Sequence, residues 1–476
     1  MKFIKLSLAT CVALSALSTM SSAQPLEEAI KGIDVSGMLR YRYTDDRYKN
    51  ELYKKDNLRG EPPRDRGSAQ HEWRAEALFK TPVVNNISMN LGIYYSNANN
   101  VNHGKGIEID NNDEKVKVPF AGEGLGSGGD GSFGVREFTA VITPDITSTT
   151  LKLGKMPLMT PLNDSDDRGT GVFITNSDIS NWSFVAGAFD SWSLDDGVPS
   201  ATDSIAKPLY TLAALSNYET SIGNFDTQLW LYYVQDIADF IGFGELAWNN
   251  NMVSLVGQYA YSKLDSTGPL SATVKDGNDL AAAPGMWGYK PKEANDLYTL
   301  QAEVNFGNFD IPAAISIGYL GNTQKGYAVS LDNEGAFNKA GNIWFENPAT
   351  GINISMFNVG GGHMPQGFEK NKLGVLYANA NYDILENLNV GIDYVIGKNK
   401  LTRGLRDEKT SGNITFQEIS PNLTWQYSKS LEISSYYSFL RSKAQKSSQI
   451  INFDPIANHT TPEDFNEFRV EVKYLF

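Results

Sequence analysis

The final segment of the chain, 467–476, alternates between charged and apolar residues, with Leu475 as the one exception. Phe, Val, Val, Tyr and Phe fill one set of positions, and Glu, Arg, Glu and Lys fill the other. Successive side chains of an extended strand point to opposite faces, so the pattern predicts a strand that meets two different environments. Such a strand can cover a soluble core or face a bilayer, and its recurrence elsewhere in the chain decides between them.

The same period-two alternation recurs along most of the chain, and long helical patterns are absent. Only residues 25–31 have the pattern of a short helix. Counting back from the C-terminus gives about 18 strands, with 16 as the alternative, and the segment 169–176 is the weakest of them. The expected strands lie near 33–43, 71–80, 87–95, 133–142, 149–156, 169–176, 182–189, 208–217, 225–235, 240–248, 252–262, 297–306, 312–320, 372–382, 388–396, 413–427, 431–441 and 467–476.

The connections between these segments alternate in length. Tight turns alternate with longer loops, and an even strand count places both termini at the turn end. Bacterial outer-membrane barrels have this asymmetry, with short periplasmic turns and longer extracellular loops. The sequence therefore predicts an all-β fold, a transmembrane antiparallel β-barrel. The lumen of a barrel of this size is too wide for side chains to fill, so an aqueous channel is expected.

The N-terminus has the layout of a secretory signal peptide. Lys2 and Lys5 form a positive start, residues 6–17 are apolar or small, and Ala23 ends a small-x-small cleavage site. Such a segment is removed on export and is too short to cross a membrane as a helix. We therefore expect a signal peptide at 1–23, a short periplasmic segment at 24–32, and a barrel at 33–476 in the outer membrane of a Gram-negative bacterium.

Composition argues against several other classes. The one cysteine, Cys11, lies inside the expected signal peptide, so we expect no disulfide, thiolate metal site or cysteine nucleophile in the exported chain. The chain carries 41 basic and 55 acidic residues, which disfavours nucleic acid as a partner. Its four histidines, at 71, 103, 363 and 459, have no characteristic catalytic neighbourhood, so we expect no enzyme activity.

The third outer loop of the expected barrel, 157–168, is the candidate pore constriction. It contains Asp164, Asp166 and Asp167, followed by Arg168. Three carboxylates so close together create a negative field, which in a constriction attracts cations and repels anions. They are also a candidate Ca²⁺ site, since Ca²⁺ accepts carboxylate oxygens in flexible geometry, although the spacing is not that of an EF-hand. No other cofactor is expected, and a solvated surface turn is the alternative interpretation.

Further charged residues lie on the strand faces opposite to the apolar ones. A charge at the bilayer midplane costs about 2–4 kcal/mol, so these side chains should point into the lumen. Arg136 and Glu137 are adjacent, so strict alternation places one of them on the less favourable face or near a rim, and we expect Arg136 to point inward. The predicted pore wall, opposite the acidic loop, consists of Arg40, Arg42, Glu72, Arg74, Glu76 and Arg136.

Segments at both ends of the chain and in the constriction resemble a known family. Residues 25–43, PLEEAIKGIDVSGMLRYRY, are similar to the start of the major outer-membrane porins of Campylobacter and related bacteria. Residues 151–171, LKLGKMPLMTPLNDSDDRGTG, resemble that family and the wider Opr-type porins, in which this loop enters the pore. The aromatic C-terminus resembles the assembly signal of outer-membrane barrels. The resemblance implies a homotrimer of 18-stranded barrels with cation-preferring diffusion.

The leading interpretation is a porin, a water-filled channel for passive diffusion of ions and small hydrophilic solutes, with a preference for cations. Its partners are then outer-membrane lipid, further copies of itself and those solutes. A substrate-selective channel of the same fold is one alternative, because a basic wall could escort carboxylates. A surface adhesin or receptor is another, because the long loops could bind other proteins. Composition does not separate these interpretations.

Overall fold

The structure is a computed structural model. It describes residues 32–51, 64–101, 107–111, 114–118, 132–164, 166–194, 205–265, 294–323, 326–332, 335–345, 347, 349–352, 354–356, 371–405, 408–444 and 462–476. The expected signal peptide and the short helix at 25–31 lie outside the described residues, as do His103, His363 and His459. No helix among the described residues is long and apolar enough to cross a membrane.

The described chain is built almost entirely from strands. One 3-10 helix, η2 (Phe306–Phe309), lies in a turn between two of them. The strands are β1 (Asp34–Glu51), β2 (Arg64–Lys80), β3 (Ile87–Val101), β4 (Ile107–Asn111), β5 (Glu114–Val118), β6 (Ser132–Ile142), β7 (Thr149–Pro157), β8 (Arg168–Asn176), β9 (Trp182–Ser193), β10 (Leu209–Thr220), β11 (Gly223–Val234), β12 (Ala238–Asn249), β13 (Val253–Leu264), β14 (Ala294–Asn305), β15 (Ala313–Gly321), β16 (Lys372–Leu385), β17 (Leu388–Leu405), β18 (Glu408–Gln426), β19 (Leu431–Ala444) and β20 (Glu463–Leu475).

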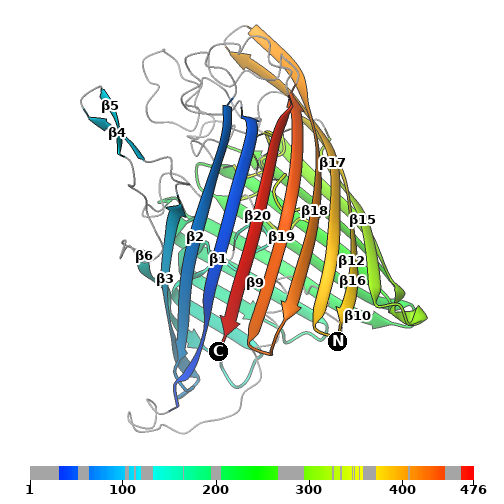
Figure 1. Cartoon of the computed structure of the whole chain (residues 1–476). Helices are drawn as coiled ribbons and strands as arrows, with labels where there is room; N and C mark the ends of the chain where they lie inside the picture. The colour runs from blue at the N-terminus through cyan, green and yellow to red at the C-terminus, as the bar shows by residue number, and fades with distance from the viewer. Residues whose placement is uncertain are drawn as a thin grey trace.

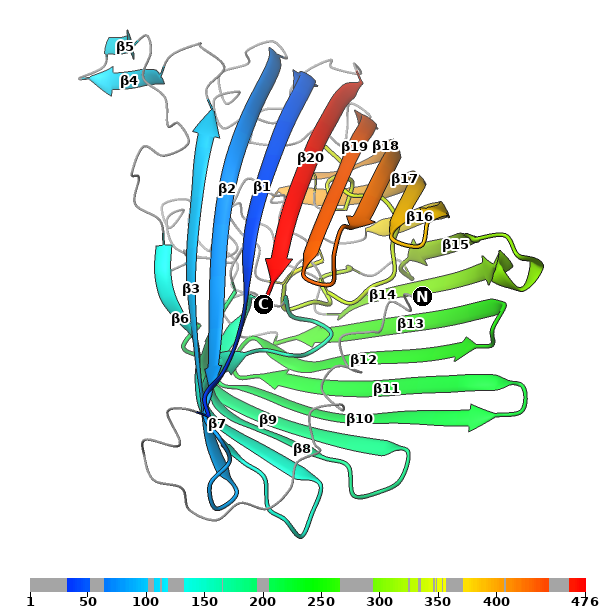
Figure 2. The same cartoon turned by 60° about the horizontal axis from the view of Figure 1, so that its bottom comes forward.

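Eighteen of these strands form one closed antiparallel sheet (Figures 1 and 2). Each strand pairs with the next along the chain, and β1 pairs with β20, which closes the ring. The remaining two, β4 and β5, form a separate hairpin in the connection between β3 and β6. The prediction of 18 strands is confirmed, including the weak segment at β8. Closure leaves no unpaired sheet edge, which hydrocarbon would penalise heavily.

The two ends of the barrel differ in how the strands are joined. At the end where the termini meet, the backbone N–H of Gly37 donates to the carbonyl oxygen of Phe476 at 2.9 Å, and every connection is a short turn. At the opposite end most connections are long. The exceptions are 235–237 and 406–407, and the paired ends of β17 and β18 project beyond the rim (Figure 1). By the usual asymmetry of bacterial barrels, the loop end is the extracellular one.

The strand β11 shows why alternation produces this wall. Leu229, Leu231 and Tyr233 are exposed on the outer face, as expected for side chains that meet lipid. The residues between them point the other way, and Trp230 and Tyr232 are each only 3% exposed. Both faces of this strand are therefore apolar near its loop end. Lipid covers the outer face, so something inside the barrel must cover the inner one.

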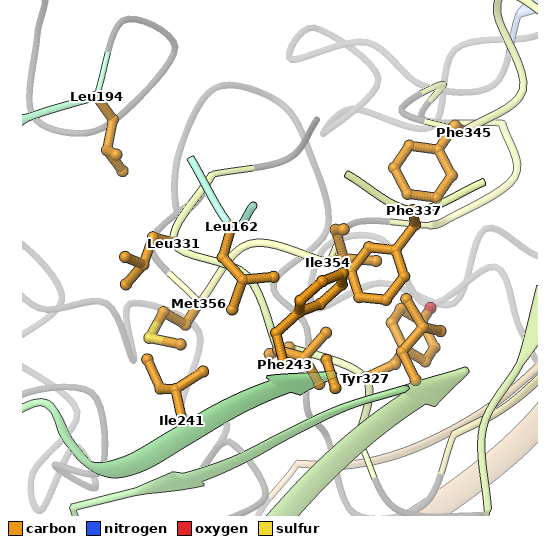
Figure 3. Packing of buried hydrophobic residues seen from close by; sticks show 14 of the residues in the cluster. Leu162, Leu194, Ile241, Phe243, Tyr327, Leu331, Phe337, Phe345, Ile354 and Met356 are labelled. Carbon is orange, nitrogen blue, oxygen red and sulfur yellow. The ribbon is translucent and has the colours of Figure 1, made fainter. Parts of the chain in front are cut away.

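A long connection inside the barrel gives such cover to strands further along the sheet. We call the described residues between 322 and 356, which join β15 to β16, the inner loop. Its Tyr327 and Trp344 are fully buried, and the Trp344 ring stacks on Phe416 of β18 at 5.6 Å between centroids. Figure 3 shows Phe337 and Ile354 of the inner loop beside Phe243 of β12. The apolar core of this molecule thus lies inside the barrel, between the wall and the inner loop.

Candidate pore constriction

The acidic loop, 157–168, reaches the wall through Asp166. Arg74 on β2 donates to both carboxylate oxygens of Asp166 through its two terminal nitrogens. Burial opposes ionisation of Asp166, but the hydrogen bonds and charge of Arg74, with the charges of Arg136 and Arg168, outweigh it and hold the pKa of this carboxyl below its ordinary value. Bidentate arginine–carboxylate pairs fix geometry as well as charge. The loop is therefore pinned against β2.

Two more arginines complete the surroundings of Asp166. An Arg136 nitrogen lies 3.8 Å from its carboxylate, and an Arg168 nitrogen lies 4.0 Å from it. The Arg168 guanidinium also sits 4.6 Å from the centre of the Tyr94 ring on β3. One carboxylate thus faces three guanidinium groups, a local excess of positive charge at the point where the acidic loop meets the wall.

Glu76 balances part of that charge. It accepts a hydrogen bond from Arg74 Nε at 2.6 Å and pairs with Arg136 on β6. These residues, with Asp166 and Arg168, form one continuous network of side chains drawn from β2, β6 and the acidic loop. Side-chain exposures of 13–23% for these residues show that the network is partly, not fully, withdrawn from solvent.

A β-bulge in β6 explains how Arg136 reaches this network. The pairing between β3 and β6 skips Arg136, because Gly92 opposes Glu137 while the next residue of β3 opposes Val135. A bulge re-aims side chains, so Arg136 and Glu137 both point inward, and Glu137 accepts a hydrogen bond from Asn90 at 2.8 Å. Strict alternation therefore does not hold at this pair, so neither side chain is forced onto the less favourable face.

A second charged network lies beside the first. Arg42 on β1 donates to Glu471 on β20 at 2.9 Å, and Arg40 pairs with Glu72 on β2. Arg42 also lies 3.6 Å from Glu72. The six predicted wall residues therefore form two adjacent clusters of mixed charge. Glu471 belongs to them as well, and the alternation of the C-terminal strand contains the signal for it, since Glu471 is on its charged face.

The three aspartates of the acidic loop have different environments. Asp167 is fully buried and accepts hydrogen bonds from the Asn163 amide at 2.8 Å and from the backbone of Asp164 at 3.2 Å. Its carboxylate shapes the loop. Asp164 accepts a hydrogen bond from the backbone N–H of Asp166 at 2.5 Å, and the Asp166 side chain faces the arginines. The described residues contain no group of three or more histidines, aspartates or glutamates arranged to hold a metal ion. They do not bring the three carboxylates of the candidate Ca²⁺ site together in one such group.

The acidic loop is also fastened to the inner loop. The carbonyl oxygen of Leu162 accepts from the backbone N–H groups of Leu331 and Asp332, both at 3.1 Å, and the Pro161 carbonyl accepts from Ala336 at 2.7 Å. The Leu162 side chain lies among Leu331, Ile354 and Phe243 (Figure 3). The candidate constriction therefore consists of two loops joined by backbone hydrogen bonds. The sequence predicts only the first of these loops, because the inner loop has no periodic pattern.

The profile of the Campylobacter major outer membrane protein family matches residues 1–474. The chain belongs to this family. Its fold is similar to that of Acinetobacter baumannii OccAB1, at 14% identity and a TM-score of 0.56, over 93% of this chain and 96% of that one. Pseudomonas aeruginosa OpdK, solved with vanillate, gives 12% identity and a TM-score of 0.53 over 93% and 98%. No curated protein matches the sequence.

Family and fold together establish the class of protein. The chain is an outer-membrane porin, and its family is one of channel proteins and not of enzymes. The expected resemblance to the Campylobacter porins, the transmembrane β-barrel and the outer-membrane location are confirmed. In this family member, the acidic loop lies against a wall that carries both arginines and carboxylates.

Proposed function

We propose that the protein forms a water-filled channel through which ions and small hydrophilic solutes diffuse passively past the two charged clusters. The observation that carries the proposal is the bidentate contact between Arg74 and Asp166, which holds the acidic loop at the wall. A fixed loop narrows a lumen that 18 strands alone would leave wide. Partly exposed charges of both signs beside it give passing solutes a transverse field.

The proposal includes a preference for cations. The contacts of the acidic loop indicate that this preference is modest. Asp167 is buried and Asp166 faces three arginines, so the acidic loop exposes less negative charge than its sequence indicates. The net formal charge of −14 favours cations over the whole protein. The selectivity should therefore depend strongly on single charges within the network.

A substrate-selective channel for anionic solutes is the second candidate. Five arginines lie close together along the wall and the acidic loop, where guanidinium groups could pass a carboxylate from one to the next. They are Arg40, Arg42, Arg74, Arg136 and Arg168. OpdK was solved with vanillate, an aromatic carboxylate, which makes vanillate a reasonable first probe. Conductance that falls saturably as vanillate is added favours this candidate.

Planar-bilayer recording of the purified protein tests the porin proposal. We expect stepwise ohmic openings and a cation-selective reversal potential in a KCl gradient. Arg74→Ala should shift the reversal potential further toward cations, and Asp166→Asn should shift it toward anions. Lys207→Ala is the control, because Lys207 forms an exposed ion pair with Asp236 outside the network. Folded protein without channel activity would overturn the proposal.

Two further parts of the proposal concern processing and assembly. Removal of residues 1–23 on export predicts that the purified protein begins at Gln24, which N-terminal sequencing tests.

The Ca²⁺ site at the acidic loop stays a proposal, tested by whether chelation changes the reversal potential. A homotrimer, proposed from the family resemblance, predicts conductance steps in groups of three and a trimer mass in native mass spectrometry. A monomer mass would overturn that part alone.

A further inference from the structure

The outer face of the barrel carries a cluster of basic residues at the loop ends of β16 to β19. Cross-strand pairing places Lys372 opposite Lys400, and Thr415 opposite both Lys398 and Lys443. Gln417 opposes Arg441 in the next row. Neighbouring strands are about 4.8 Å apart, so these side chains share one small area. We call it the basic patch: Lys372, Lys398, Lys400, Arg441 and Lys443, all of them exposed.

Strand β17 shows the level of the patch relative to the bilayer. Its outward residues from Leu388 to Ile396 are apolar, and Lys398 is the next outward residue. From Leu388 to Ile396 the strand rises by eight residues of about 3.3 Å each, and such strands are tilted by about 40° from the barrel axis. This segment therefore spans roughly 20 Å of the membrane, close to the apolar band of about 25 Å on such barrels. The patch therefore begins where hydrocarbon ends, at the headgroups of the outer leaflet. A cation costs little there, in contrast to the midplane.

A recess of about 700 Å³ opens within the patch. Tyr319, Leu376 and Ile396 give it an apolar side, and Lys398, Arg441 and Lys443 line it with positive charge. Gly374 also lines it, and a Cβ there would lie only 2.8 Å from the Tyr319 hydroxyl, so the glycine lets this ring lie close to the wall. The site thus combines an apolar surface toward the membrane with cations at headgroup height.

The charge of the patch is poorly balanced by the protein itself. Within the described part of the chain, its one ion pair is that of Arg441 with Asp464, at 3.6 Å. Elsewhere at the loop end, Lys263 pairs with Asp239 at 2.7 Å and Lys207 with Asp236 at 2.5 Å. Like charges placed directly opposite each other destabilise a sheet, so the patch should be stabilised by an anion.

We propose that this recess binds the phosphorylated headgroup of an outer-leaflet lipid, with an acyl chain on the apolar side. Phosphate oxygens suit clustered lysine and arginine donors, and basic pockets on membrane proteins bind anionic headgroups in this way. The ligand class is a lipid that carries phosphate on its headgroup, as the glycolipid of the outer leaflet does. The inference rests on the outer-membrane location and is independent of solute selectivity.

Native mass spectrometry of the full protein, released from detergent with diphosphorylated lipid A, tests this proposal. We expect bound lipid on the wild type and about 100-fold weaker binding after combined Lys398→Gln, Arg441→Gln and Lys443→Gln changes, since each basic residue near an anionic surface contributes about fivefold. The matched control, Lys207→Gln with Lys263→Gln, should bind as the wild type does. Replacing Lys398 and Lys443 by Arg should retain binding, which separates lost charge from misfolding.

Two arms of the experiment identify the source of the phosphate. Dephosphorylated lipid A should bind far more weakly, and millimolar inorganic phosphate alone should not displace the intact lipid. Wild-type protein without bound lipid, or a triple variant that binds like the wild type, would overturn the proposal. Complete displacement by inorganic phosphate would also overturn it, because the recess would then be a site for free anions.

Discussion

The inner surface of this barrel has two unlike regions. On the covered wall, which lies between β12 and β19, apolar side chains such as Phe243 and Phe416 are buried against the inner loop. On the ionic wall, formed by β20, β1, β2 and β6, the inward side chains are arginines and carboxylates that pair with one another. The outer faces of both regions are apolar. The two regions therefore differ in their inward side chains and in what those side chains contact.

Because of that difference, we expect the covered wall to determine the stability of the inner loop and the ionic wall to determine the ion selectivity of the channel. Burial of apolar area stabilises by about 25 cal/mol per Å², so the covered wall can fix a long loop without any ion pair. The ionic wall uses partly exposed charged pairs, which contribute less to stability but create a field in the channel. We therefore expect changes on the covered wall to alter how wide the pore is. Changes on the ionic wall should alter which ions pass through it.

The largest effect should follow a change on the covered wall, Trp344→Ala. Trp344 is fully buried, stacks on Phe416, and donates from its indole nitrogen to the Ala340 carbonyl at 2.7 Å. Loss of a buried tryptophan costs about 3–5 kcal/mol, which should loosen the inner loop. Single-channel conductance should rise, and limited proteolysis should cleave the inner loop faster.

The control for that change is Ile146→Ala, which removes an apolar side chain that is 96% exposed in a turn. Its conductance and protease resistance should match those of the wild type. If Trp344→Ala also left both properties unchanged, the inner loop would not be what narrows the pore. The contrast between a covered wall and an ionic wall would then have no functional meaning.

A smaller effect should follow the titration of Asp166 on the ionic wall. Its pKa lies below the ordinary value, so the contact with Arg74 is present at neutral pH and is lost only as the pH falls through that lowered pKa. The difference in reversal potential between wild type and Asp166→Asn should therefore persist at pH 4, near the pKa of an ordinary aspartate. Disappearance of the difference at pH 5 would contradict the arginine contacts.

The strands were predictable from the sequence for a physical reason. Lipid on the outer face enforces apolar residues at every second position, and this requirement is local to each strand. The charged wall could also be predicted, because a charged side chain on the face opposite to the apolar one must point into the lumen. The bulge at Arg136 could not be predicted, because it depends on the register between two strands and not on the composition of either strand.

The inner loop was missed because its contacts are distant in the sequence. Glu418 on β18 accepts from the backbone of Asn342 at 2.6 Å, and Ser442 on β19 donates to the Ala349 carbonyl at 2.6 Å. No periodicity marks such a segment. One signal was available, however, because the loop half of β11 is apolar at consecutive positions. A strand that is apolar on both faces must be covered on both.

The smallest effect should come from a change outside both walls, in the turn between β8 and β9. Hydrogen bonds from Thr147, Asn176 and the backbone of Ser148 lower the pKa of Asp178 to about 2. A lowered pKa means that the stabilisation is present above the ordinary pKa of 3.8 and is lost as the pH falls toward 2. Asp178→Asn should slightly lower the thermal midpoint at pH 7 but not at pH 2. The control Glu219→Gln, an exposed change on β10, should leave the thermal midpoint unchanged at both pH values.

Conductance and reversal potential should match the wild type in both variants, because neither side chain belongs to the covered or the ionic wall. A shift in either electrical property would show that the turn end also contributes to the pore.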